Sequence, residues 1–256
     1  MTPRACSLPL LLLTILAGCG SKPAGPPPLR VAAASDLQMA LPIVIARFKS
    51  DTGIDVEPSY GASGQFAQQI RAGAPFDLFL AANRAFVDDL ARAGSIRPES
   101  VRPYARGSLV LVVNDLFDPG VKTLADLAGA KVKSIAIANP DIAPYGAAAR
   151  QVLEREGLWE GVRPKLVMAE NVRQALQFVE SGNAEVGFVG RALADVKGVR
   201  KVPIAPGSYA PIVQGMGIVA ESGRRNDAER FARFLIGDVG QGILRDFGFL
   251  SIGDLP

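Results

Sequence analysis

The stretch LRVAAASDLQMALPIVIARFKSDTGIDVEPS, residues 29–59, sets the pattern from which the fold is predicted. Its first part, residues 29–34, is a short apolar run of the kind that buried strands have. A segment of helical period follows over residues 37–52, and residues 54–59 have the composition of a second strand. A strand, a helix and another strand in this order are typical of parallel strands joined by a crossover helix.

The same alternation continues along the chain, which predicts an α/β fold whose sheets are mostly parallel and flanked by helices. Two long apolar stretches, residues 107–113 and 212–220, are expected to carry the chain from one lobe to another and back. Residues 227–249 are predicted to form two helices, broken near Gly237. The remaining predicted helices are 64–72, 84–93, 146–157 and 172–181, and the remaining predicted strands are 77–81, 134–138, 164–167 and 185–189.

The two crossings divide the chain into two lobes of similar size. Residues 29–108 and 214–256 are assigned to the first lobe, and residues 109–213 to the second. Because two crossings can act as a hinge, the lobes are expected to close over a ligand. In α/β folds the ligand lies in the crevice beyond the carboxyl ends of the strands.

The N-terminus has the features of an export signal. Arg4 precedes an apolar run at residues 8–17, which is too short to span a bilayer, so residues 1–18 are predicted to be a lipoprotein signal peptide. The sequence LAGC at residues 16–19 resembles the site where bacteria cleave and lipidate a cysteine. Residues 19–28 are a proline-rich tether. We therefore expect an extracytoplasmic lipoprotein that is attached to a membrane only through a lipid on Cys19.

Composition excludes several classes of function. The chain contains no histidine, and Cys6 lies within the signal, so Cys19 is the only cysteine left after processing. Histidine triads, histidine metal sites and intramolecular disulfides are thereby excluded. Removal of Arg4 with the signal leaves 27 basic residues out of 28, against 25 acidic ones, which gives no support to nucleic-acid binding. No common catalytic motif is present, so we expect a binding protein, not an enzyme.

Four loops between a predicted strand and a predicted helix offer donors for an anion. They contain Ser35, then Ser63 within YGASG, Tyr145 within NPDIAPYG, and Val172 after Asn171. The first amides of a helix are unpaired and lie at the positive end of its dipole, so such loops favour anions. Each signal is weak by itself, because helix capping, a turn or packing would explain it equally well.

Five stretches of the chain carry a family resemblance. They are VAAASDLQMALPIVIARFKSDTGIDV at residues 31–56, YGASGQFAQQIRAGAPFDLFLAANRAFVDDL at 60–90, IAIANPDIAPYGAAARQVL at 135–153, AENVRQALQFVESGNAEVGFVG at 169–190, and YAPIVQGMGIV at 209–219. Together, through essentially the whole predicted mature chain, they resemble the periplasmic molybdate-binding proteins of ABC importers. The resemblance implies a type II periplasmic-binding-protein fold with two lobes and two hinge crossings.

The resemblance implies an oxyanion held by backbone amides and hydroxyls of both lobes. Ser35, Ser63, Tyr145 and Val172 match the family's contact positions, and they would hold molybdenum only as molybdate, through its oxygens. Asp36 stands where one branch has a contacting asparagine; its carboxylate would repel a dianion, so its amide is the expected contact. A second departure is Gly190, where another branch has a tyrosine; Tyr145 is expected to supply that contact.

The expected function is capture of molybdate or tungstate and delivery to the permease subunits of an ABC importer. We expect a monomer with no cofactor, whose partners are the small oxyanion and the permease, and no nucleic acid. The alternatives are a binding protein for sulfate, phosphate or another oxyanion, and an enzyme that uses Asp36 or Asp141 as a base. A ferric-ion binder with Tyr60 and Tyr145 as ligands is a third possibility.

Overall fold

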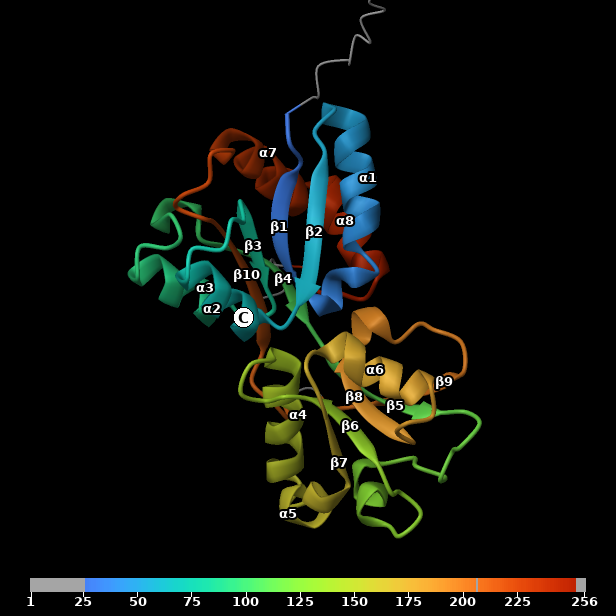
Figure 1. Cartoon of the computed structure of the whole chain (residues 1–256). Coiled ribbons are helices and arrows are strands. Elements are labelled where there is room, and N and C mark those ends of the chain that lie inside the picture. The colour runs from blue at the N-terminus through green and yellow to red at the C-terminus, as the bar shows by residue number, and fades with distance from the viewer. Residues whose placement is uncertain (1–25, 206, 252–256) are drawn as a thin grey trace, which may run out of the picture.

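The protein, described by a computed structural model over residues 26–205 and 207–251, has two lobes, each built on a five-stranded sheet (Figure 1). The predicted signal peptide and most of the tether lie outside the described residues. None of the described helices is long and apolar enough to cross a membrane.

The first lobe has the strand order β2-β1-β3-β10-β4. The three strands on one side are parallel to one another, whereas β10 runs antiparallel to both β3 and β4. The strands are β1 (Leu29–Ala34), β2 (Val56–Gly61), β3 (Leu78–Ala81), β4 (Arg102–Gly107) and β10 (Ile212–Ile218).

Helices cover both faces of this sheet. One core joins Val31 and Leu80 to the apolar faces of α1, α7 and α8, and includes the edge-to-face contact of Phe48 with Phe231. A second core packs α2 and α3 against Ala32 and Phe79 on the other face. The helices are α1 (Leu41–Thr52), α2 (Ser63–Arg71), α3 (Arg84–Arg92), α7 (Arg225–Ile236) and α8 (Asp238–Asp246), with short 3-10 helices η1 (Ser35–Gln38) and η2 (Pro98–Ser100).

The second lobe repeats the plan, with the strand order β7-β6-β8-β5-β9. Again three strands are parallel and the next one, β5, is antiparallel to its neighbours. Its elements are β5 (Leu109–Asn114), β6 (Ile135–Ala138), β7 (Leu166–Ala169), β8 (Val186–Gly190), β9 (Val199–Pro203), α4 (Pro144–Arg155), α5 (Trp159–Val162), α6 (Val172–Glu180), η3 (Leu124–Ala128), η4 (Arg163–Lys165) and η5 (Arg191–Leu193).

The chain passes from the first lobe to the second between β4 and β5, with Ser108 alone between the two strands. It returns before β10, which pairs along the first sheet from Ile212 onward. The stretch 107–113, which was expected to cross between the lobes, contains the crossing at Ser108 and most of β5. The sheets are more mixed than expected, because both sheets place an antiparallel strand beside three parallel ones.

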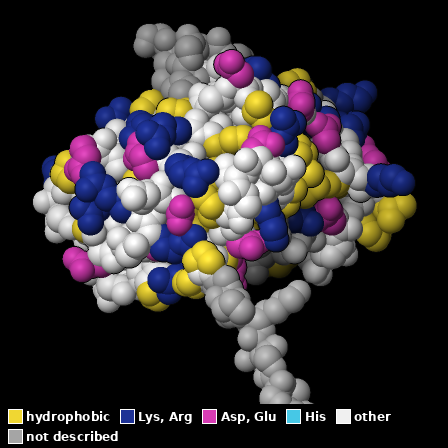
Figure 2. All heavy atoms as spheres, turned by 90° about the horizontal axis from the view of Figure 1, so that it is seen from above, with side chains coloured by type: hydrophobic (Ala, Val, Ile, Leu, Met, Phe, Trp, Pro, Cys, Tyr) yellow, Lys and Arg dark blue, Asp and Glu magenta, His cyan; other side chains and the backbone are white. Residues whose placement is uncertain are grey.

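The outer face of the first lobe carries charges of both signs. In the view from above, basic and acidic side chains are intermingled over this face (Figure 2). Some are ion pairs, such as Lys49 with Asp55 at 2.5 Å and Arg47 with Asp51 at 3.1 Å. Pairs this exposed contribute little to stability, and their mixture gives this face no single sign of charge.

Candidate functional site

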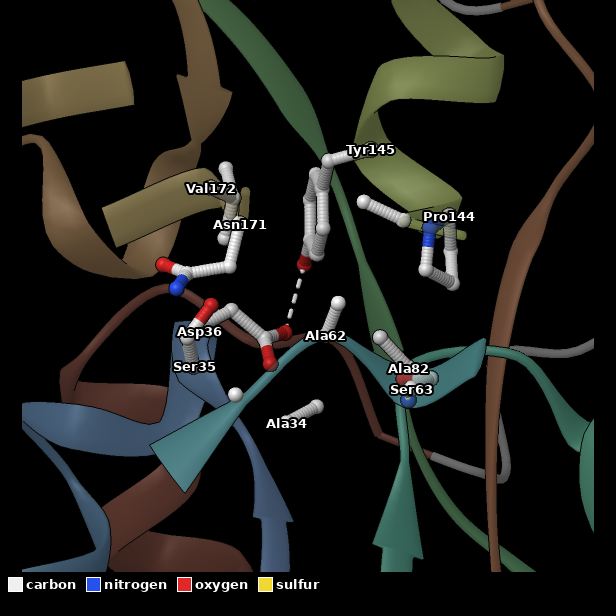
Figure 3. A pocket seen from close by; sticks show the side chains of 12 residues that line it. Ala34, Ser35, Asp36, Ala62, Ser63, Ala82, Pro144, Tyr145, Asn171 and Val172 are labelled. Atoms are coloured by element: carbon white, nitrogen blue, oxygen red, sulfur yellow. Dashed lines mark hydrogen bonds between the residues drawn. The ribbon is translucent and has the colours of Figure 1, made fainter. Parts of the chain in front are cut away.

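A small pocket lies between the lobes, at the carboxyl ends of β1 and β2 and at the first turns of α2, α4 and α6 (Figure 3). Its cavity volume is about 10 Å³, close to what one water molecule needs, so only a compact ligand can be enclosed there. The lining residues are Ala34, Ser35, Asp36, Gly61, Ala62, Ser63, Ala82, Ala143, Pro144, Tyr145, Asn171 and Val172.

All five residues singled out in the sequence line this pocket. Ser35, Asp36 and Ser63 come from the first lobe, and Tyr145 and Val172 come from the second. Each of the five side chains is buried. The structure thus brings together residues that are up to 137 positions apart in the chain, counted from 35 to 172.

Ser63 is oriented by a neighbouring strand end. Its hydroxyl oxygen accepts a hydrogen bond of 2.9 Å from the backbone N–H of Ala82, which follows β3. Because that bond uses a lone pair of the oxygen, the hydroxyl proton stays free to be donated to a ligand. Ser63 is also the first residue of α2, so its own backbone N–H has no intrahelical partner.

The second lobe contributes the first turns of two helices. Pro144 begins α4, which places the N–H of Tyr145 in the unpaired first turn. In α6 the side-chain oxygen of Asn171 accepts from the amides of Arg173 and Gln174, both at 3.1 Å. The cap leaves the N–H of Val172 as the helix's first amide, at the positive end of the dipole.

Asp36 is the centre of a buried hydrogen-bond network between the lobes. Its Oδ2 accepts from the hydroxyl of Tyr145 at 2.8 Å and from Nε2 of Gln214 on β10. Its Oδ1 is buried without a hydrogen-bond partner. Burial raises the pKa of Asp36 to about 6, against the hydrogen bonds from Tyr145 and Gln214, which lower it.

The hydroxyl of Tyr145 requires glycine at two facing positions. A Cβ added to Gly107 would collide with this hydroxyl, and one added to Gly190 would lie 3.1 Å from the ring. Tyr145 therefore occupies the space beside Gly190 where a side chain would otherwise stand. Its hydroxyl donates its single proton to Asp36, so it cannot at the same time donate to an anion. The donor that Tyr145 can offer to a ligand in this arrangement is its first-turn backbone N–H.

The pocket offers neutral donors and one carboxyl group. None of its described lining residues is a lysine or an arginine. In the described part of the chain, no group of three or more His, Cys, Asp and Glu is placed to hold a metal ion. Tyr60 and Asp141, which the iron and enzyme alternatives would use, do not line the pocket.

Sequence reasoning missed Gln214 and the amide of Ala82. Gln214 is fully buried and stands within the apolar strand Ile212–Ile218. A single amide side chain inside such a run was a usable signal, because buried polar groups need partners. The role of the Ala82 amide depends on tertiary contact, and its residue type carries no sign of it.

The chain is similar to known binding proteins in both sequence and fold. The family model described as bacterial extracellular solute-binding protein matches residues 29–250. The molybdate-binding protein ModA of Azotobacter vinelandii is 35% identical, covering 95% of this chain and 98% of the relative. The putative ABC transporter substrate-binding lipoprotein YvgL of Bacillus subtilis is 31% identical, covering 94% of this chain and 95% of the relative.

Solved structures give the same result. The periplasmic molybdate-binding protein of Azotobacter vinelandii superposes with a TM-score of 0.82 at 33% identity, covering 89% of this chain and 99% of that one. The sulfate-binding protein SubI of Mycobacterium tuberculosis has a TM-score of 0.75 at 18% identity, which shows a shared fold alone. By sequence and fold, the chain belongs to the bacterial extracellular solute-binding protein family.

Proposed function

We propose that this protein captures molybdate or tungstate and delivers it to the permease of an ABC importer. The observation that carries the proposal is the meeting of four donor loops from two lobes in one pocket. Ser35 and Ser63 would act through hydroxyls and amides, and Tyr145 and Val172 through first-turn amides. Donors of this kind stabilise an anion without a cationic partner.

The relatives support the choice of anion. The Azotobacter vinelandii protein is named as molybdate-binding in both comparisons and is covered over nearly its whole length. The four donor residues of this chain supply hydrogen atoms to oxygen acceptors, and a tetrahedral oxyanion offers four such oxygens. Each bond to a charged oxygen contributes about 1.5–3 kcal/mol, so four loops acting together support tight binding.

Binding requires a small change in the distance between the lobes. A tetrahedral anion needs more room than the cavity volume of about 10 Å³. We propose that the first lobe, with residues 29–107 and 212–251, and the second lobe, between the two crossings, move as two bodies about the crossings beside Ser108 and before Ile212. An open form would admit the anion and a closed form would enclose it, as in other hinged binding proteins.

The proposed location is outside the cytoplasm, with the chain held at a membrane by a lipid on Cys19. The family is extracellular by description, and one relative is named as a lipoprotein. The proposed partners are therefore the permease subunits and the anchoring membrane, and the protein acts as a monomer. Mass spectrometry of protein isolated from membranes would detect the lipid, and Cys19→Ala should release the protein into the soluble fraction.

The anion is tested by isothermal titration of the purified protein with molybdate, tungstate, sulfate and phosphate. We expect one-to-one binding of molybdate and tungstate, and no heat from sulfate or phosphate at the same concentrations. Preferred binding of sulfate or phosphate would show that the ligand is another oxyanion. Silence with all four anions would contradict oxyanion capture.

A further inference from the structure

The Asp36 carboxyl group is unusual for a pocket that is to hold a doubly charged anion. It is fully buried and lines the pocket together with the proposed donors. A carboxylate beside a dianion costs free energy through like-charge repulsion, strongly so where water is excluded. The group must therefore be neutral, or share a proton, when the pocket is filled.

The hydrogen bonds of Asp36 show which oxygen would carry the proton. Oδ2 already accepts two hydrogen bonds, from Tyr145 and from Gln214. Oδ1 has no partner among the described residues. A neutral carboxyl group placed here would keep Oδ2 as the carbonyl acceptor and bear its proton on Oδ1. In Figure 3 this second oxygen is turned toward the part of the pocket lined by Ala34 and Ala62.

We propose that the site binds its oxyanion together with one proton, held between Oδ1 of Asp36 and an oxygen of the anion. Asp36 is then a specificity-determining residue that discriminates against the weakly basic sulfate, whereas rejection of phosphate rests on the fit of the donors. This inference rests on the proposed capture of an oxyanion and adds a selection by basicity to the selection by size. Tyr145 and Gln214 are positioning residues, because they occupy Oδ2 and so direct the proton to Oδ1.

Among the described residues around Asp36, no other group is placed to take this proton. Burial raises the pKa of Asp36 to about 6, and the groups that act on its carboxyl are the donors Tyr145 and Gln214 and backbone amides, none of which accepts a proton. Burial also raises the pKa values of Tyr104 on β4 and Tyr145 on α4 well above the usual range, with Asp36 adding to both shifts, so both stay neutral. Burial raises the pKa of Tyr60 on β2 to about 12.

Arginines on two of the helices that pack against the Asp36 segment form ion pairs of their own. The short helix η1, which carries Asp36, packs against η5 and α6. Arg191 on η5 makes an ion pair with Asp195, and Arg173 on α6 makes one of 2.6 Å with Glu180. The negative charge of a bound dianion would thus act on Asp36 without a compensating cation, and it would raise the proton affinity of Asp36 further.

A shared proton distinguishes anions that cavity size alone separates poorly. Molybdate and tungstate are stronger bases than sulfate, so their oxygens accept a hydrogen bond from a carboxyl proton more readily. Sulfate would accept only a weak hydrogen bond from the carboxyl proton, and the ionised form of Asp36 would repel sulfate. Selection would therefore act through the free energy of one hydrogen bond, in addition to the fit of the four donors.

The test is titration of molybdate at several pH values with the wild-type protein and with Asp36→Asn. Above about pH 6 the free wild-type site has lost its proton and must take one up on binding, so its affinity should fall about tenfold per pH unit. Asparagine keeps an acceptor for Tyr145 and Gln214 and carries permanent N–H donors. Its affinity should change by less than about threefold over the same range, and at pH 8 it should exceed that of the wild type.

The proton is counted directly by repeating the titration at about pH 8 in buffers of different ionisation enthalpy. The expected uptake is about one proton per anion for the wild type and none for Asp36→Asn. Asp141→Asn, which removes an exposed carboxylate outside the pocket, is the control and should take up the same proton as the wild type. If Asp36→Asn does not fold, the proton count of the wild type decides alone.

Two results would overturn the inference, and they have different meanings. Molybdate binding with no proton uptake and no dependence of affinity on pH would refute the shared proton and leave oxyanion capture intact. Absence of binding at every pH would refute oxyanion capture and the shared proton together.

Discussion

The hydroxyl group of Ser63 is both an acceptor within the first lobe and a possible donor to a ligand between the lobes. Its oxygen accepts from Ala82 within the first lobe, and its proton is free to be donated into the interlobe pocket. Ser63→Ala should therefore weaken molybdate binding by about 1.5–3 kcal/mol, roughly ten- to a hundredfold in Kd. Isothermal titration measures the change, and Ser181→Ala on the exposed end of α6 should leave Kd unchanged. An unaltered Kd in Ser63→Ala would mean that the hydroxyl does not contact the ligand and that this loop is only a turn.

Asp36 should make the stability of the ligand-free protein depend on pH. Its pKa is 3.8 in an unfolded chain and about 6 in the folded one, so it contributes stability below the lower value that is lost as pH rises through the higher one. The contribution amounts to about 3 kcal/mol. Denaturant unfolding measures this: as pH rises from about 4 to 7, the unfolding free energy of the wild type should fall relative to that of Asp36→Asn. A constant difference would contradict this placement of Asp36.

At this scale the sequence predicted the positions of the donors but not their connections. Ser35, Ser63, Tyr145 and Val172 follow strand ends and begin helices, and such local patterns are visible in a sequence. The bond between Asp36 and Gln214 joins residues 178 positions apart. No local pattern encodes that distance, because it depends on how the returning strand β10 is placed beside the first lobe.

The elements that hold the lobes together meet in a direct backbone contact. The N–H of Gly64 in the first turn of α2 donates to the carbonyl oxygen of Ile142 in the second lobe at 2.9 Å. A Cβ at Gly64 would lie 2.9 Å from that oxygen and 3.0 Å from the Cα of Ile142. Both are backbone atoms of the other lobe, so relief of the clash requires a backbone shift, and we expect it to move the lobes apart.

Gly64→Ala should therefore impair closure more than folding. We expect molybdate affinity to fall by at least about tenfold, while the unfolding free energy without ligand changes by no more than about 1 kcal/mol, since alanine is well tolerated in helices. Gly223→Ala is the matched control, because a Cβ there meets nothing within 4 Å. A variant that binds as tightly as the wild type would show that this contact is not part of the closed state.

Most elements were predicted from hydrophobic pattern, and the two missed strands share one cause. Strands β4 and β9 lie at sheet edges and carry charged residues such as Arg102, Arg106, Arg200 and Lys201. Edge strands face solvent along one side, so charges are tolerated there and the apolar signal is lost. The buried strands β1, β5 and β10 were recognised because both of their faces are covered.

At the scale of the whole molecule, closure links binding to stability. A ligand held by both lobes stabilises the folded state by RT ln(1 + [L]/Kd), about 4 kcal/mol at a concentration about 1,000 times Kd. Molybdate should therefore raise the melting temperature, and sulfate at equal concentration should not. Thermal unfolding followed by circular dichroism measures this shift. An equal shift with both anions would show that the pocket does not distinguish them.

The position of the anion can be observed directly in crystals grown with tungstate, by the anomalous scattering of tungsten. We predict one strong peak between Ser35, Ser63, Tyr145 and Val172. The anion oxygens should lie within hydrogen-bond distance of the amides or hydroxyls of these residues, and one oxygen should face Asp36. A peak at another site, or none in the interlobe pocket, would contradict the proposal that these residues form the oxyanion site.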